Sequence, residues 1–134
     1  MQDFYPRPRS PFDASALERL RRMGLAGADG QADQDAMAVF AHIFAGQFFD
    51  DLCDYYQNSG AVRDLLVQML DSAGTAEPKQ RFLLICVQYD AMYRTLPDPI
   101  WWLSGSPAFA EPFADGFLAH LQQLYQTMPE GETP

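Results

Sequence analysis

The stretch from Asp33 to Asn58 decides the fold, and it reads DQDAMAVFAHIFAGQFFDDLCDYYQN. It contains no proline and only one glycine, so little in it opposes a helix. Its apolar residues recur every three or four positions, which is the period of a helix face. They form two rows: Met37, Phe40, Phe44, Phe48, Leu52 and Tyr55 in the first, and Val39, Ile43, Phe49, Cys53 and Tyr56 in the second. A helix with two apolar rows is contacted from more than one side, so we expect a long central helix over about residues 33–58.

The rest of the chain predicts further helices, separated by glycine and proline residues. Gly24 is placed to end a short first helix, and Pro78 is tolerated in the first turn of another. The expected elements are helices over about residues 14–23, 59–74 and 78–96, a breaker-rich connection over 97–107, and a last helix that begins at Pro107 or Pro112 and ends near Met128. We therefore predict an all-α fold, a compact bundle of four to five helices around the long central one.

The two ends of the chain differ in composition from the helical part. Residues 1–12 contain three prolines, which remove amide donors and push the preceding residues into extended geometry. They predict an extended Pro/Arg-rich arm, and residues 129–134 predict a disordered tail. At 134 residues, the chain has the length of one domain, which we expect over residues 13–128.

The charge of the chain restricts its partners. It carries 18 acidic and 9 basic side chains, a net charge of −9. This balance argues against direct binding to nucleic acid or to an anionic membrane, because both need a basic surface. Residues 1–22 are the exception, with five arginines against three acidic side chains. We expect this basic segment either to lie on the acidic body of its own chain or to meet a partner.

The cysteines and the absence of a leader predict a compartment. The chain has two cysteines, which is too few for a disulfide framework, and they do not form a CxxC motif. We find no charged-then-apolar leader. The purest apolar run, Phe82 to Val87, is far shorter than the roughly 20 residues that span a bilayer. These features predict a cytoplasmic protein.

The sequence shows no catalytic or metal-binding constellation. Neither His42 nor His120 has an acidic residue at the offsets that build helix-borne metal pairs. Cys53 lies near Asp50, which disfavours the thiolate, and Cys86 lies in the run that we expect to be most buried. There is no glycine-rich phosphate loop. We therefore expect no enzyme, no cofactor and no metal, with one alternative: a helical small-molecule or haem-binding protein that uses His42 as the ligand.

Three acidic residues, Asp50, Asp51 and Asp54, stand where local stability disfavours them. Carboxylates near a helix C-terminus oppose the helix dipole, by about 0.3–1 kcal/mol for charges in the last turn. Asp50 and Asp54 also repel each other at a spacing of four residues. Two interpretations remain: a contact strip for a basic partner, or internal ion pairs. The arginines expected to form such pairs are Arg19, Arg21, Arg22 and Arg63.

Trp101 and Trp102 are adjacent in the proline-bounded connection. Neighbouring residues on an extended segment point in different directions, so both rings are hard to bury in one pocket. Either they cover an end of the bundle, or one of them is an exposed anchor, since tryptophan is enriched at interface hot spots.

Together these features predict a small acidic interaction module that binds another protein. It would be a regulator, adaptor, inhibitor or chaperone, and its contact residues would be Trp101, Trp102, Asp50, Asp51 and Asp54. The partner could present a basic surface, and a homodimer through the last helix stays an alternative. A further alternative is a nucleic-acid-mimicking inhibitor of a DNA-binding protein.

Overall fold

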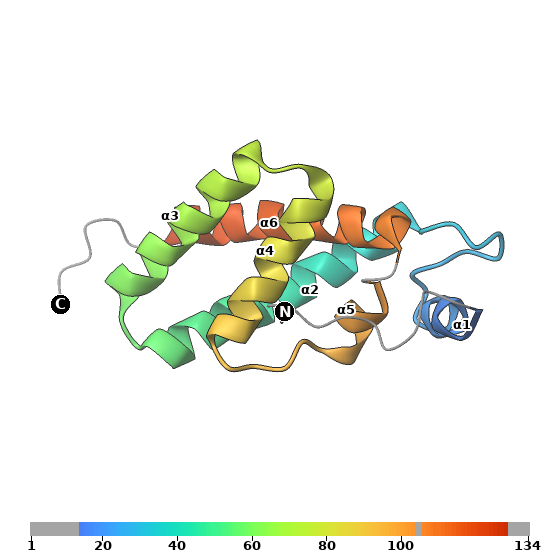
Figure 1. Cartoon of the computed structure of the whole chain (residues 1–134), viewed down its shortest axis with the longest axis horizontal. Coiled ribbons are helices and arrows are strands. Elements are labelled where there is room, and N and C mark those ends of the chain that lie inside the picture. Colours follow the sequence, from blue (N-terminus) through green and yellow to red (C-terminus); the bar gives the residue numbers. More distant parts are fainter. Residues whose placement is uncertain (1–13, 104–105, 129–134) are drawn as a thin grey trace, which may run out of the picture.

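The computed structural model describes residues 14–103 and 106–128, and this part of the chain is helical (Figure 1). The predicted arm over 1–12 and the predicted tail over 129–134 lie outside the described residues. The helices are α1 (Ala14–Arg22), α2 (Gln34–Tyr56), α3 (Ser59–Thr75), α4 (Pro78–Ala91), α5 (Asp98–Leu103) and α6 (Pro107–Thr127). No strand occurs among them. The all-α prediction, with a long helix over the 33–58 stretch, is confirmed.

The core forms where α2 and α6 pack side by side, running in the same general direction (Figure 1). The two backbones come close at Gly116 of α6, where an added Cβ would stand 3.0 Å from the Cβ of Ala41. Aromatic rings fill the space on either side of this contact. Their ring centroids are 5.5 Å apart for Phe40 and Phe113, and 5.1 Å apart for Phe48 and Phe117.

The helices α3 and α4 run in opposite directions and lie against this pair (Figure 1). Arg81 of α4 joins three of the helices. Its Nε donates to the carbonyl of Ala73 in α3 at 3.2 Å, and its Nη1 lies 2.9 Å from Oδ1 of Asp115 in α6. The short α5 contacts α6 and α1, so α1 is held at one end of the molecule.

Polar side chains cap the N-termini of two of these helices. Asp33 caps α2 by accepting a bond from the amide of Ala36 at 3.0 Å. Asn58 caps α3, since its Oδ1 accepts from the amide of Ala61 at 2.8 Å.

The connection over 97–107 and the end of α4 differ from the sequence-based prediction. The connection contains the six-residue helix α5, because Pro99 falls in its first turn, where no amide donor is required. The fourth helix ends at Ala91 and not near Leu96, because the backbone at Tyr93 is left-handed and cannot continue the helix. Pro112 does not mark the start of the last helix but lies inside α6.

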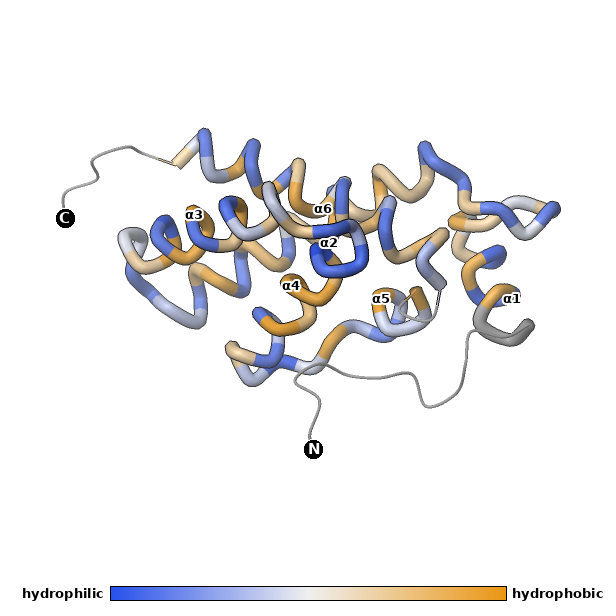
Figure 2. The backbone as a smooth tube through the Cα atoms, turned by 45° about the horizontal axis from the view of Figure 1, so that its top comes forward, coloured by the Kyte–Doolittle hydropathy of each residue, from blue (hydrophilic) through white to orange (hydrophobic). Residues whose placement is uncertain are grey.

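The second apolar row of α2 is a correction to the prediction. Val39 and Ile43 are 60% and 51% exposed, and Cys53 is exposed as well. The buried residues of the first row are Met37, Phe40, Phe48 and Leu52, and Tyr55 at its end is 41% exposed. In the second row Phe49 and Tyr56 pack against the core, whereas no described helix covers Val39 and Ile43. Figure 2 shows the resulting alternation of hydrophobic and hydrophilic segments along the helices. The long helix is therefore packed mainly on one side.

The contact between α2 and α6 gives a first testable prediction. Gly116→Ala places a methyl group against the Cβ of Ala41, which is fixed to the backbone, so the helices must separate. We expect the free energy of unfolding to fall by about 1–2 kcal/mol in chemical denaturation. The control is Gly46→Ala in α2, where an added Cβ meets nothing within 4 Å. This control should gain up to about 1 kcal/mol from helix propensity, and equal effects of both variants would contradict the packing argument.

Candidate functional site

The three aspartates near the end of α2 lie beside an arginine from another part of the chain. Arg94, in the connection after α4, places Nη1 3.8 Å from Oδ1 of Asp51 and Nη2 3.3 Å from Oδ2 of Asp54. Exposed pairs of this kind contribute only about 0–1 kcal/mol. Asp50 is exposed and has no ion-pair partner within residues 14–103 and 106–128.

The internal partner is thus Arg94, and not one of the four arginines expected from the sequence. Arg21 and Arg22 pair with Glu18 at 3.4 and 3.5 Å. Arg19 lies over the ring of Trp102, and Arg63 lies over the ring of Tyr125, each 5.4 Å from the ring centroid. Internal pairing therefore explains part of the aspartate cluster but leaves Asp50 unneutralised.

Tyr93 has an unusual backbone conformation at the end of α4. The amide of Arg94 donates to the carbonyl of Tyr89 at 3.0 Å, and the amide of Tyr93 donates to the carbonyl of Asp90 at 2.9 Å. This pair of bonds is the Schellman motif, which requires a left-handed residue, and Tyr93 has φ 56°. Glycine usually fills that position, because a side chain there costs roughly 1–2 kcal/mol. The side chain of Tyr93 is 88% exposed, so burial does not offset this cost.

The end of α1 makes the same motif with the usual residue. Its amides at Gly24 and Leu25 donate to the carbonyls of Arg21 and Leu20, both at 2.9 Å. Gly24 adopts φ 80°, which glycine reaches without a steric penalty. The chain therefore uses glycine at one such turn and an exposed tyrosine at the other.

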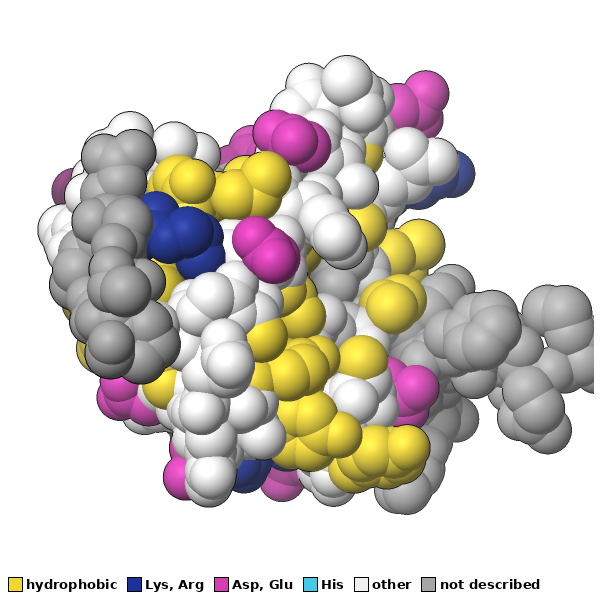
Figure 3. All heavy atoms as spheres, turned by 90° about the vertical axis from the view of Figure 1, so that its left-hand side faces the viewer, with side chains coloured by type: hydrophobic (Ala, Val, Ile, Leu, Met, Phe, Trp, Pro, Cys, Tyr) yellow, Lys and Arg dark blue, Asp and Glu magenta, His cyan; other side chains and the backbone are white. Residues whose placement is uncertain are grey.

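Tyr55 of α2 joins Tyr93 to the aspartates. It is 41% exposed, and its ring centroid lies 6.5 Å from that of Tyr93 and 4.8 Å from that of Tyr56. We name the combined region the tyrosine–aspartate surface, made of Tyr55, Tyr93, Asp50, Asp51, Asp54 and Arg94. Figure 3 looks onto the end of the molecule where α2 ends, and it shows hydrophobic side chains gathered there with acidic side chains beside them.

A pocket opens next to this surface, at the end of α4. It has a volume of about 340 Å³, and Tyr93 and Arg94 form part of its lining. The remaining lining residues are Cys86, Tyr89, Asp90, Thr95 and Leu96. The exposed ring of Tyr93 and the side chain of Arg94 therefore border a hollow that is large enough to receive a side chain.

The two predicted tryptophans are placed elsewhere, on α5. Both are half-buried and pack against the core. The guanidinium of Arg19 in α1 covers the ring of Trp102, so this ring already has a partner within the chain. A role for Trp101 and Trp102 in binding stays a prediction, and neither side chain is as exposed as Tyr93.

His42 and His120, the only histidines of the chain, meet across α2 and α6. Their ring centroids are 3.6 Å apart and their planes are inclined by 38°. His42 is exposed and His120 is half-buried. His42 thus faces outward beside another imidazole, whereas a haem ligand requires an apolar pocket around it. The described residues contain no group of three or more potential metal ligands.

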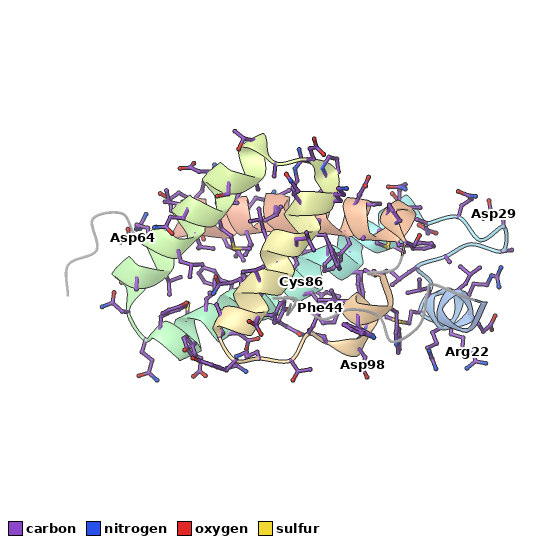
Figure 4. All side chains as sticks on the ribbon, in the orientation of Figure 1. Arg22, Asp29, Phe44, Asp64, Cys86 and Asp98 are labelled. Atoms are coloured by element: carbon purple, nitrogen blue, oxygen red, sulfur yellow. The ribbon has the colours of Figure 1, made fainter. Side chains whose placement is uncertain are left out.

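The two cysteines differ in their surroundings. Burial raises the pKa of the Cys86 thiol to about 12, and this residue lies near the centre of the molecule (Figure 4). The pKa of Cys53 is also raised, first by partial burial and then by the charge of Asp50. Both thiols are therefore held in their neutral form, which makes them poor nucleophiles.

Sequence reasoning missed the two residues that give the surface its character, Tyr93 and Arg94. The helix predicted over residues 78–96 includes both of them. Pro97 disfavours helical geometry only at Leu96, so it gave no signal that the helix ends before Tyr93. The pairing of Arg94 with Asp51 and Asp54 cannot be predicted from the sequence, because it depends on how α4 crosses α2.

Comparison of the chain with protein-family models, with curated proteins and with solved structures gives no match. Within the described residues, no helix has the length and apolar character needed to cross a membrane. The site must therefore be interpreted from its own geometry and chemistry.

The left-handed residue at the end of α4 gives a second prediction. Tyr93→Gly should raise the free energy of unfolding by about 0.5–1 kcal/mol, because it removes the backbone strain and loses little buried area. Gly24→Ala, at the equivalent position of α1, should lower it by about 1 kcal/mol for the opposite reason. Thermal or chemical denaturation measures both. A loss of stability in Tyr93→Gly would show that the ring itself supports the fold.

The buried thiol of Cys86 gives a third prediction, for alkaline pH. Its pKa is raised from an ordinary value of 9.0 to about 12, so the folded state keeps a proton that the unfolded state releases. The stability that this provides is fully present below pH 9.0 and is lost as the pH rises from there toward about 12. We expect the free energy of unfolding to fall by about 2 kcal/mol between pH 8 and 10.5. Cys86→Ala should show a smaller fall, in urea titrations at both pH values, and an identical fall would contradict this assignment.

Proposed function

We propose that this protein is a small interaction module that binds another protein through the tyrosine–aspartate surface. The observation that carries the proposal is Tyr93, an 88% exposed tyrosine held in a left-handed conformation. Local stability favours glycine there, so a tyrosine at this position is best explained by what the ring contacts outside the chain. Tyrosine is one of the residues most enriched at binding hot spots.

The neighbours of Tyr93 support the same function. Tyr55 extends the aromatic contact, and the pocket beside Tyr93 and Arg94 offers space for a side chain of the partner. Hot-spot residues of one protein commonly insert into pockets of the other. This surface offers both an exposed aromatic ring and a pocket. The anchor of the contact is then Tyr93 rather than the half-buried tryptophans of α5.

The acidic half of the surface favours a partner with basic residues. Asp50 has no partner in the described chain, and Asp54 keeps 75% of its side chain exposed despite Arg94. A lysine or arginine opposite them would relieve the repulsion within α2 and guide the approach of the partner. Figure 4 shows Asp29, Asp64 and Asp98 at separate edges of the molecule. This spread of charge supports a local acidic contact more than an extended mimic of nucleic acid.

The function is tested by co-purification from the native cell, followed by identification of the bound proteins. Proteins captured by the wild-type chain should be lost or reduced about tenfold or more with Tyr93→Ala, because hot-spot truncation costs at least about 2 kcal/mol. Asp50→Lys should reduce capture as well, since it reverses a charge that faces the partner.

Two matched variants control for the surface and for the charge. Val39→Ser changes another exposed apolar residue of α2, and Asp71→Lys reverses an exposed charge on α3. Both should capture the same proteins as the wild type. Capture that is unchanged in Tyr93→Ala and Asp50→Lys, with intact helical circular dichroism, would reject the proposed surface.

A further inference from the structure

The contact between His42 and His120 has no role in the interaction surface described above. The centroids of the two imidazole rings are only 3.6 Å apart, although the residues belong to different helices. The close approach of α2 and α6 at Ala41 and Gly116, one residue before His42 and four before His120, brings them together. Both side chains are at least partly exposed, so an ion from solvent has access to them.

The orientation of one ring is set by a neighbouring side chain. Nδ1 of His120 lies 3.3 Å from Oε1 of Gln123, one turn later in α6. A hydrogen bond to one ring nitrogen fixes the imidazole and leaves the other nitrogen available, which is the usual arrangement of metal-binding histidines. In this arrangement the faces of the two rings stack, with their planes inclined by 38°. A metal ion binds an imidazole nitrogen in the plane of its ring, so the exposed ring of His42 has to rotate until one of its nitrogens and the other nitrogen of His120 reach the same ion.

The surroundings of the pair suit a cation. No charged side chain occurs in α2 between residues 38 and 46, or in α6 between residues 116 and 124. No basic group on these turns therefore repels an ion, and the net charge of −9 on the chain favours its approach. Imidazole nitrogen is a preferred ligand of zinc, nickel and copper ions.

We propose that His42 and His120 form a two-histidine site for a divalent transition-metal ion. The two imidazoles supply two ligands, and water completes the coordination shell because the pair is open to solvent. The ion joins α2 to α6 and so stabilises the contact on which the core is built. This site is separate from the tyrosine–aspartate surface and does not depend on the proposed function.

Nickel is the probe for the test, because it binds imidazole and does not oxidise the exposed thiol of Cys53. Isothermal titration of Ni²⁺ into the wild-type protein at neutral pH should give one ion per chain. His42→Gln and His120→Gln should each weaken binding by about tenfold or more, because either change removes the advantage of two linked ligands. Ni²⁺ should also raise the Tm of the wild type and leave the Tm of both variants unchanged.

Cys53→Ser provides the matched control, because Cys53 is the exposed sulfur ligand of the described chain. It should bind Ni²⁺ as the wild type does. The proposal is overturned by a wild type that does not bind, by binding that survives in either histidine variant, or by loss of binding in Cys53→Ser. Two sites of equal affinity in the wild type would also overturn it, since they would mean that the histidines bind ions independently.

Discussion

The close contact of α2 with α6 is the constraint on which the rest of the structure depends. At Ala41 and Gly116 the backbones approach so closely that one additional methyl group does not fit without movement. That approach sets the distance at which the phenylalanine rings on both sides interlock. It also brings the only two histidines into contact. The remaining helices are arranged around this pair, with α3 and α4 on its side and α5 holding α1 at one end.

The main features of this arrangement could be predicted from the sequence, because they depend on local rules. The long helix, its cap at Asp33 and the glycine that ends α1 follow from spacing, capping and backbone freedom. The outward face of α2 could not be predicted in the same way. Val39 and Ile43 repeat at helical spacing as regularly as core residues do, and only the position of the other helices decides which row is covered. The pairing of Arg94 with Asp51 and Asp54 depends equally on the crossing of two helices.

The candidate site illustrates the same limit. The sequence indicated Asp50, Asp51 and Asp54, because acidic residues near the C-terminus of a helix destabilise it. The structure places an exposed aromatic ring beside them. The sequence did not indicate Tyr93, because a tyrosine near the end of a helix is unremarkable until its φ is known. Two helix ends with the same hydrogen bonds, one closed by Gly24 and one by Tyr93, show that the turn fixes the backbone conformation but not the residue type.

The pairing of α2 with α6 also has a consequence for the rate at which the chain folds. Helical bundles usually fold quickly because neighbouring helices meet first. Here the two helices of the core are separated by all of α3, α4 and α5, so their contact must close a long loop of chain. Until it closes, Phe40 lacks its contact with Phe113, and Phe48 lacks its contact with Phe117. The transition state for folding is therefore expected to be organised around a non-local contact, as in proteins of higher contact order.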